Sequence, residues 1–313
     1  MRALVTGGAG FIGSHLVERL LADGHEVVVL DDLSAGSLDN LPSHQRLTFV
    51  EGDIRDADRC AAACKGVTNV LHQAARNSVP RSIAHPQAAL EVNVTGSFNL
   101  LRAAVDAGAK RFIYASSSSV YGADPRLPKQ ESHAPAAMSP YAATKAAVEQ
   151  LARSWWHAYG LPTVGLRYFN VFGPRQDPAG AYAAVVPRFV VAALQGEPAT
   201  IYGDGESGRD FTFVDNVVAA NLRALEAPAS CFGQVYNVAL GQRITVSQLH
   251  RAIGEAAGHY LPAQHTPPRR GDVRNSLADP SAAMSALGFL PEVAFEEGIQ
   301  RTVAWYRKHW RQR

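Results

Sequence analysis

Residues 1 to about 165 alternate short, unbroken apolar runs with longer stretches in which apolar residues recur at helical spacing. An unbroken run of this kind is typical of a strand buried on both faces, and the alternation predicts an α/β fold with a doubly wound parallel sheet. The predicted strands are 3–5, 27–30, 47–50, 70–72, 111–115, 163–167 and, returning to the sheet later, 234–238. The predicted helices are 14–22, 88–107, 141–159, 183–194, 215–226, 246–257 and 295–310.

After residue 168 the alternation loosens, and loops rich in glycine and proline separate the predicted elements. A second, smaller α/β region is therefore predicted, interleaved with the end of the first region rather than joined to it by one linker. The predicted boundaries are 1–168 with 209–240 for the larger domain, and 169–208 with 241–313 for the smaller one.

Three glycines, Gly7, Gly10 and Gly13, follow the first strand and precede the first helix. One glycine permits a tight turn, one lets the backbone approach a diphosphate, and one lets the helix pack closely on the strand. The helix N-terminus is a natural phosphate site. A glycine turn without a ligand is the alternative, which the acidic pair Asp31 and Asp32 after the second strand disfavours. A carboxylate there favours the free ribose hydroxyls of NAD over the phosphate of NADP.

Two further segments follow predicted strands and should face the same edge of the sheet. Asp53 and Ile54 follow the third strand, where the adenine of a bound dinucleotide would lie. A helix cap at Asp53 is an equally good interpretation. Gln73, Ala74 and Ala75 follow the fourth strand, and small residues there let the backbone pass close to a cofactor. A tight packing contact would require the same residues.

Hydroxyl and amine groups gather after the fifth strand. Four serines, 116–119, stand at its carboxyl end, where ligands bind in open parallel sheets, although such a string alone is typical of a solvated turn. Tyr141 and Lys145 lie four residues apart at the start of the next helix and share one face. A lysine cation near a phenol lowers the pKa of the phenol and makes the tyrosine a usable base. The nearby serines and glycine turn disfavour the alternative of an incidental surface pair.

A glycine-rich loop at 202–211 carries Arg209. The guanidinium of an arginine is suited to bidentate contact with a phosphate, which makes this loop a candidate for binding an anionic ligand. A plain turn in which Arg209 pairs with an acid is the competing interpretation.

Composition excludes several classes of protein. The chain has 313 residues, of which 47% are hydrophobic and 19% charged, and a formal net charge of +2, which is too small for a nucleic-acid surface. Because no apolar run approaches the length of a membrane span and the chain starts directly with a strand, we expect a cytoplasmic protein without membrane association. Cys60, Cys64 and Cys231 are expected to be reduced and structural. No metal-ligand spacing occurs, so no metal is expected.

Seven motifs spread over nearly the whole chain occur together. They are GGAGFIG at 7–13, HQAA at 72–75, NVTG at 93–96, SSSSVYG at 116–122, YAATK at 141–145, RYFNVFGPRQDP at 167–178 and GRDF at 208–211. In this combination the chain resembles the extended short-chain dehydrogenase/reductase family, and within it the nucleotide-sugar 4-epimerases. The resemblance implies a Rossmann sheet that binds NAD, a smaller domain that binds a UDP-sugar, and a homodimer formed through residues 88–107 and 139–159.

The resemblance also implies roles for individual residues. Ser117, Tyr141 and Lys145 would form the catalytic trio, with Ser118 as a helper. The predicted cofactor contacts are Gly7, Gly10, Phe11, Ile12, Asp31, Asp32, Asp53, Ile54, Gln73, Ala74, Ala75, Asn93, Ser116, Tyr141, Lys145 and Tyr168. The predicted substrate contacts are Ser78, Val79, Ser117, Ser118, Asn170, Val186, Tyr202, Arg209, Arg269, Asp272 and Ser276.

The expected reaction is epimerisation at C4 of the sugar. Dehydratases and decarboxylases that resemble this chain carry an acid after the serines, where Ser119 stands here. In the implied mechanism Tyr141 takes the proton of the C4 hydroxyl while C4 gives hydride to NAD. The 4-keto sugar then rotates about its diphosphate link and is reduced on its other face.

The expected substrate follows from one position. Ser276 stands where 4-epimerases confined to UDP-glucose and UDP-galactose carry a bulky tyrosine, so it leaves room for an N-acetyl group. UDP-N-acetylglucosamine and UDP-N-acetylgalactosamine are therefore the expected pair, with UDP-glucose and UDP-galactose tolerated. The alternatives are a UDP-hexuronic acid 4-epimerase, a nucleotide 4-keto-sugar reductase, and a non-catalytic NAD-binding module.

Overall fold

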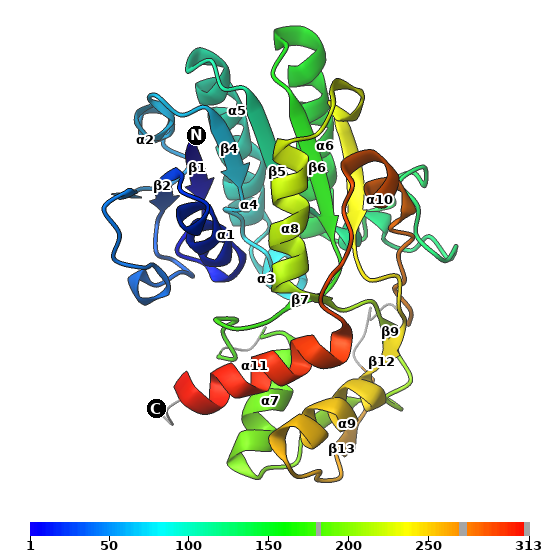
Figure 1. The fold of residues 1–313 in the computed structure, drawn as a ribbon. Coiled ribbons are helices and arrows are strands. Elements are labelled where there is room, and N and C mark those ends of the chain that lie inside the picture. Colours follow the sequence, from blue (N-terminus) through cyan, green and yellow to red (C-terminus); the bar gives the residue numbers. More distant parts are fainter. Residues whose placement is uncertain (180–182, 269–273, 310–313) are drawn as a thin grey trace.

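A seven-stranded sheet forms the centre of the larger lobe (Figure 1). The computed structural model describes residues 1–179, 183–268 and 274–309. The strands run in the order β11-β6-β5-β4-β1-β2-β3, and every neighbouring pair is parallel. They are β1 (Arg2–Thr6), β2 (Glu26–Asp31), β3 (Leu47–Glu51), β4 (Asn69–His72), β5 (Arg111–Ser117), β6 (Thr163–Tyr168) and β11 (Gln234–Val238). The predicted doubly wound parallel sheet is confirmed.

Helices cover both faces of the sheet. On one face α2 (Ala57–Cys64), α5 (Ser97–Asp106) and α6 (Pro140–Tyr159) pack on Leu4, Val28 and Val70. On the other face α1 (Phe11–Ala22) and α8 (Val214–Leu225) pack on Val5 and Val29, which alternate with the first set along the strands. Both faces are therefore buried, which explains why the strands are unbroken apolar runs rather than alternating ones.

The longest of these helices has clear start and stop signals. Ser139 caps α6 by accepting a hydrogen bond from the backbone N–H of Ala142, and Pro140 occupies the first helical position. Gly160 ends the helix in the left-handed conformation. Because the helix starts at a defined residue, Tyr141 and Lys145 lie at fixed positions in its first two turns.

The helix predicted at 88–107 is present as one continuous helical run, but its middle part is π-helical rather than α-helical. The chain forms α3 (Val79–Ala84) and α4 (Pro86–Leu90), then a π-helical segment η2 (Glu91–Gly96), and only then α5. A π-helical turn inserts an extra residue into the helical repeat, and such turns are frequent at functional sites. Here the segment carries Asn93, which is 1% exposed.

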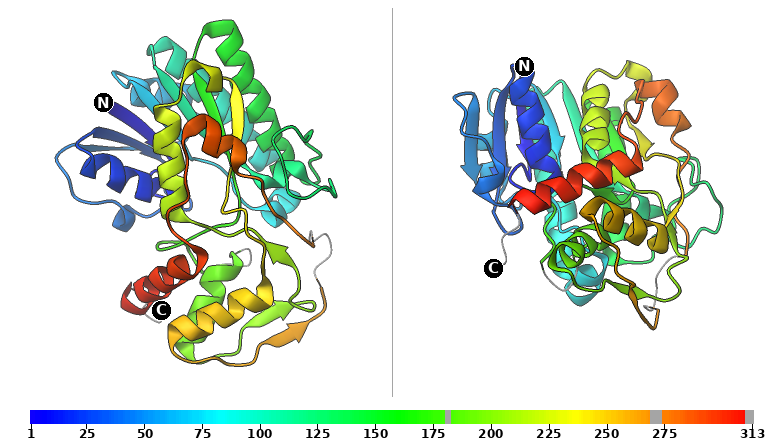
Figure 2. Two further views of the ribbon diagram at one scale, coloured as in Figure 1. Left: turned by 45° about the vertical axis from the view of Figure 1, so that its right-hand side comes forward. Right: turned by 60° about the horizontal axis from the view of Figure 1, so that its bottom comes forward.

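The smaller lobe is built from α7 (Val185–Gln195), α9 (Val246–Ala257) and α11 (Phe295–His309), which share one apolar cluster (Figures 1 and 2). Short strand pairs belong to this lobe or connect it to the sheet: β7 (Val171–Phe172) with β10 (Thr212–Phe213), β8 (Thr200–Tyr202) with β13 (Gln264–Thr266), and β9 (Gly208–Arg209) with β12 (Ile244–Thr245). The late helix α10 (Ser281–Leu287) packs instead on β11 and α8 of the larger lobe. The chain passes between the lobes several times, so the interleaving expected from the sequence is visible in the ribbon.

Within residues 1–179, 183–268 and 274–309, no helix is both long and apolar enough to cross a bilayer. The same residues contain no group of three or more His, Cys, Asp or Glu side chains that could hold a metal ion. Cys60, Cys64 and Cys231 are free and buried.

Candidate active site

The glycine turn between β1 and α1 is a tight cradle. Gly7 has φ +67°, and a Cβ added to it would lie 2.7 Å from the backbone nitrogen of Ala74. A Cβ on Gly13 would lie 2.1 Å from the carbonyl oxygen of Gly7. The residue that caps α1 is Gly10, which has no side chain to occupy the first-turn N–H groups. In the described part of the chain, no side chain therefore caps the first turn of α1, and its N–H groups are left for a diphosphate, which fits the phosphates of NAD.

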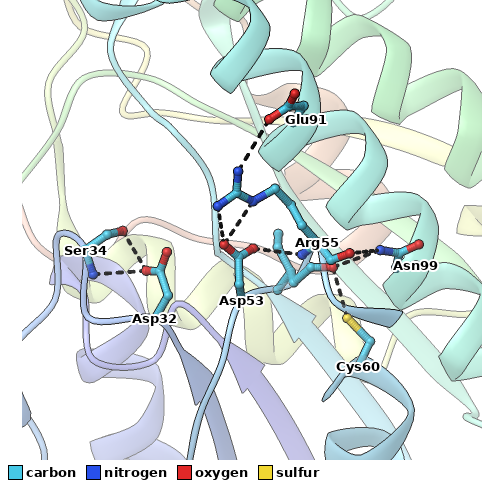
Figure 3. Close-up of polar contacts among 8 residues, drawn as sticks. Asp32, Ser34, Asp53, Arg55, Cys60, Glu91 and Asn99 are labelled. Atoms are coloured by element: carbon cyan, nitrogen blue, oxygen red, sulfur yellow. Dashed lines mark hydrogen bonds and ion pairs between the residues drawn. The ribbon is translucent and has the colours of Figure 1, made fainter. Parts of the chain in front are cut away.

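The acidic pair lies at the carboxyl end of β2, and its carboxylates are held by the backbone. Asp31 Oδ2 accepts the N–H of Ala9 from the glycine turn at 2.9 Å, and Asp31 Oδ1 accepts that of Leu33 at 2.9 Å. Asp32 Oδ1 accepts both the N–H and the hydroxyl of Ser34 (Figure 3). Burial raises the pKa of Asp31, while these N–H bonds oppose the rise. Because each carboxylate oxygen has two lone pairs, Asp31 keeps acceptor capacity for ribose hydroxyls.

The segment after β3 is held in place by hydrogen bonds and an ion pair with side chains of η2 and α5 (Figure 3). Arg55 bonds Asp53 Oδ2 at 2.6 Å and reaches Glu91 on η2 at 3.4 Å. Asn99 on α5 donates to the carbonyl oxygens of Ile54 and Arg55 at 3.1 and 2.9 Å. The N-cap of α2 is Asp56, so the interpretation of Asp53 as a helix cap is wrong.

An open cavity of about 690 Å³ lies beside this segment. It is lined by Asp32 after β2, by Phe49, Val50 and Glu51 of β3, by Gly52 and Asp53 after it, and by Asp56 and Arg59 at the start of α2. The cavity thus follows the carboxyl ends of β2 and β3, which is where the sequence places the adenosine half of the cofactor.

A chain of hydrogen bonds under the glycine turn leads toward the predicted catalytic helix. Ser97 donates its single proton to the carbonyl oxygen of Asn93, so its oxygen must accept from His72 Nε2 at 2.8 Å. Neutral His72 then accepts at Nδ1 from the hydroxyl of Thr6, at 2.7 Å. Asn93 Nδ2 in turn donates to the hydroxyl of Thr144 on α6 at 2.9 Å. Hydrogen bonds therefore link β1, which precedes the glycine turn, to α6, which carries Tyr141.

Tyr141, Lys145 and Ser117 meet at the carboxyl edge of β5. Burial raises the pKa of Tyr141, and a hydrogen bond from Ser117 opposes that rise. Lys145 Nζ donates to the carbonyl oxygen of Ala115 at 2.8 Å and lies 6.0 Å from the centre of the Tyr141 ring. Burial lowers the pKa of Lys145 to about 8, while the charge of Glu149 opposes the fall. The expected lowering of the Tyr141 pKa by Lys145 is not seen, because burial of the phenol dominates.

The serine string is not a solvated turn. Ser116 is 3% exposed, and its hydroxyl donates to Glu149 Oε1 at 2.5 Å. Ser119 donates its N–H and its hydroxyl to Ser117 Oγ, at 3.2 and 2.9 Å. Ser117 therefore accepts from its own turn and keeps its proton for Tyr141. Ser118 begins the 3-10 turn that follows β5.

The predicted substrate residues come from both lobes. Asn170 after β6 has φ +32°, a conformation that non-glycine residues rarely adopt, and donates to the carbonyl oxygen of Asp210 at 2.8 Å. Arg209 Nη1 donates to the carbonyl oxygens of Gly208 and Arg274. The N–H of Ser276 donates to the same Gly208 carbonyl, at 3.0 Å.

Other predicted contacts are distributed around the same edge of the sheet. Ser78 caps α3, with the partly exposed Val79 next to it, and Val186 is buried in α7. Tyr168 bonds Gln73 through its hydroxyl at 3.2 Å. The predicted contacts Arg269 and Asp272 lie outside the described residues.

A sequence profile of the NAD dependent epimerase/dehydratase family matches residues 3–239. The chain belongs to this family. It is 45% identical to a UDP-glucose 4-epimerase of Mycolicibacterium smegmatis over 98% of this chain and 99% of the relative.

Two similar solved structures are 4-epimerases. One is the UDP-glucose 4-epimerase of Thermotoga maritima with UDP-glucose, at a TM-score of 0.94 and 40% identity over 98% of this chain and 99% of that one. The other is the UDP-N-acetylglucosamine 4-epimerase of Methanobrevibacter ruminantium in complex with UDP-N-acetylmuramic acid, at a TM-score of 0.94 and 42% identity over 98% of both chains. The resemblance stated from the motifs is confirmed, and with it NAD as the cofactor of the family.

Sequence reasoning missed four residues of this epimerase/dehydratase site: Arg55, Asn99, Glu149 and Arg167. None belongs to a predicted contact set, yet each bonds a segment that carries one. Two of them left a signal in the sequence. Glu149 lies one helical turn after Lys145, and Arg167 interrupts an otherwise apolar strand, which requires a buried partner.

Proposed function

We propose that the protein is an NAD-dependent UDP-sugar 4-epimerase whose preferred pair is UDP-N-acetylglucosamine and UDP-N-acetylgalactosamine. The observation that carries this proposal is the position of Tyr141, Lys145 and Ser117 at the sheet edge that also holds the glycine cradle. A binding module has no use for a buried phenol bonded to a serine beside a buried ammonium. Two of the similar proteins are also named 4-epimerases, with identities of 40% and above.

The reaction divides between the cofactor and the chain. NAD, when bound, supplies the reversible oxidation at C4 of the sugar. Tyr141 Oη accepts the proton of the C4 hydroxyl and returns it when the carbonyl is reduced. Ser117, which can both donate and accept, bonds the C4 oxygen and relays that proton. Burial raises the pKa of Tyr141, so the phenolate needs two positive charges: the Lys145 ammonium, whose bond to Ala115 fixes its position, and the nicotinamide that NAD⁺ would supply when bound.

We assign binding to the two lobes as the sequence predicts. Residues 1–168 with 209–240 hold NAD, through the glycine turn, Asp31 and the segment at Asp53. Residues 169–208 with 241–313 hold the UDP-sugar, with Ser276 beside the C2 substituent. Arg209, the first residue of the segment 209–240 of the larger domain, also serves this site, as a cation for the diphosphate. The short side chain of Ser276 supports the N-acetylated sugar, as does the likeness to a UDP-N-acetylglucosamine 4-epimerase.

We further propose a homodimer through α4, α5 and α6. Leu90 and Phe98 on this surface are 55% and 40% exposed, and Phe98 packs edge to face on Trp155 at 5.5 Å. Exposed apolar side chains next to one another are typical of an interface. Light scattering after size exclusion should give twice the chain mass, and a monomer would contradict this assignment.

The function is tested by mixing purified protein, without added cofactor, with UDP-N-acetylglucosamine, UDP-glucose or UDP-glucuronic acid and following the sugars by proton NMR. We expect the galacto epimer in the first tube at the highest rate. Absence of any epimer, even after NAD⁺ is supplied, would contradict the proposal. Epimerisation only of UDP-glucuronic acid would retain the reaction but replace the substrate.

Two variants separate the catalytic and specificity roles. Tyr141→Phe should bind UDP-sugar and NAD as the wild type does, yet lose roughly a factor of 10²–10⁴ in kcat, the usual contribution of a general base. Near-normal turnover would refute the role of the phenol. Ser276→Tyr should lower the rate with UDP-N-acetylglucosamine and spare UDP-glucose, and an equal loss with both would show that position 276 does not sense the C2 substituent.

A further inference from the structure

A buried ion pair lies directly behind the catalytic trio. Arg167 donates from Nε to Glu149 Oε1 at 2.9 Å and from Nη2 to Glu149 Oε2 at 2.7 Å, and each side chain is only 3% exposed. The hydroxyl of Ser116 donates to the same Oε1 at 2.5 Å. The guanidinium also stacks on the Tyr121 ring, with 4.7 Å between Cζ and the ring centroid. The pair is thus bidentate and removed from water.

This pair joins α6 and β5, the two elements that carry the trio, to the neighbouring strand β6. Glu149 lies on α6, four residues after Lys145 and eight after Tyr141, and so shares their face of the helix. Ser116 precedes Ser117 on β5, and Arg167 lies on β6. One carboxylate therefore ties the helix that holds the phenol and the ammonium to the strand that holds the serine.

A pair of this kind is poorly explained as a source of stability. Removing two charges from water is costly, and apolar residues of similar size often replace a buried ion pair without loss of stability. The carboxylate of Glu149 can instead stabilise the charged form of Lys145, which is buried one helical turn away and has lost its hydration.

The groups around Lys145 differ in charge. From β4, His72 faces it in the neutral form, since burial lowers the pKa of His72 to about 3. From β5 comes the Ala115 carbonyl, and from α6 come the phenol of Tyr141 and the carboxylate of Glu149. The phenol of Tyr114 on β5, whose pKa burial raises, interacts with Glu149 and Arg167. From β6, Arg167 adds a positive charge that is paired with the Glu149 carboxylate.

We propose that Glu149 is a positioning residue of the epimerase site, which fixes α6 against β5 and β6 through Ser116 and Arg167 and whose charge keeps the Lys145 ammonium protonated. The inference rests on the proposed function, because its readout is epimerase turnover. Wild-type activity is measured first, so failure of the proposed function is seen before any variant is compared.

The test compares the pH dependence of kcat for Glu149→Gln, Ser116→Ala and the double variant Glu149→Gln with Arg167→Met. Loss of the carboxylate removes the charge that opposes the fall of the Lys145 pKa and leaves the Arg167 guanidinium without its counter-charge. The alkaline limb of the profile should therefore move to lower pH by roughly one unit. Ser116→Ala removes one hydrogen bond and no charge, so it should lower kcat without moving the limb. In the double variant the limb should lie between those of the wild type and Glu149→Gln.

A role in packing alone would lower kcat equally at every pH. A folded Glu149→Gln variant with the wild-type limb would therefore overturn the proposal, as would a limb that moves as far in Ser116→Ala. Circular dichroism and thermal unfolding establish that each variant is folded. Should Glu149→Gln not fold, Glu149→Asp keeps the charge on a shorter side chain. Its kcat should fall while its limb stays at the wild-type pH, and a shifted limb in that variant would refute the electrostatic role.

Discussion

Lowering the pH from 7.5 to 5.5 should weaken the fold through one buried histidine. His72 is 4% exposed, and both of its ring nitrogens are already used, one accepting from Thr6 and the other donating to Ser97. A second proton would have to displace the Thr6 hydrogen bond. Burial, with a smaller contribution from the Lys145 charge, lowers the pKa of His72 from 6.5 to about 3.

The sign and size of the effect follow from that shift. Below pH 6.5 the unfolded chain binds a proton at this residue while the folded chain does not, so the free energy of unfolding falls as the pH falls toward about 3. With these two pKa values the loss between pH 7.5 and 5.5 is about 1.3 kcal/mol. At most about 1.4 kcal/mol per pH unit can come from one group.

Urea unfolding of three proteins at both pH values measures the effect. His72→Gln keeps a donor toward Ser97 but cannot titrate, so its loss of stability between the two pH values should be smaller than that of the wild type by about 1.3 kcal/mol. Thr6→Ala is the control: it destabilises the same network yet keeps the histidine, so it should retain the pH-dependent loss. Other titrating groups, such as Asp210, whose pKa burial raises to about 7, are common to all three and cancel in the difference. Equal losses in the wild type and His72→Gln, within about 0.3 kcal/mol, would refute the reasoning.

Two further predictions concern the backbone and the cofactor. Gly122 has φ +52°, and a Cβ there would lie 1.7 Å from the carbonyl oxygen of Ala136, so Gly122→Ala should cost more than about 3 kcal/mol in urea unfolding. Gly108, with φ +68° and no atom within 4 Å of such a Cβ, is the matched control and should cost about 1 kcal/mol; equal costs would exclude the clash. Asn99→Leu should release NAD several-fold more readily, measured as cofactor content after gel filtration, because the carbonyl of Arg55 loses this donor and that of Ile54 keeps, among the described residues, only the Cys60 thiol. Unchanged retention would show that this anchoring is not needed.

The fold was predictable because each strand of the sheet is buried on both faces. A run such as Val27–Leu30 has no polar residue, so its pattern is read without knowing its neighbours. The π-helical part of the helix at 88–107 was not predictable for a related reason. Apolar spacing indicates a helix but not which hydrogen bonds it forms. In the π-helical segment the hydroxyl of Ser97 donates to the backbone carbonyl of Asn93, and the side-chain oxygen of Asn93 accepts from the N–H of Arg76.

The candidate site was predictable where the residue type and its spacing indicate a specific chemistry. It was not predictable where a side chain hydrogen-bonds distant backbone groups. Tyr141 and Lys145 stand out by type and spacing. Asn99 does not, because its partners at Ile54 and Arg55 are about 45 residues away in the chain, and an asparagine on a helix is normally read as a tolerated surface residue. Glu149 is similar, since nothing in the local pattern reveals that Arg167 is its partner.

The positions of these anchors have a common physical origin in the parallel sheet. Where a strand runs beyond its neighbour, its carbonyl groups lose the partners of the ladder and must be satisfied by other donors. β4 ends at His72, opposite Tyr114, so the carbonyl of Ala115 on β5 is free on that side and receives Lys145. The carbonyls of Ile54 and Arg55, just beyond β3, receive Asn99 in the same way. The carboxyl edge thus requires polar side chains from the following helices even before any ligand binds. A lysine that satisfies such a carbonyl is already desolvated and fixed at the carboxyl edge of the sheet, which is the state that the role proposed for Lys145 requires.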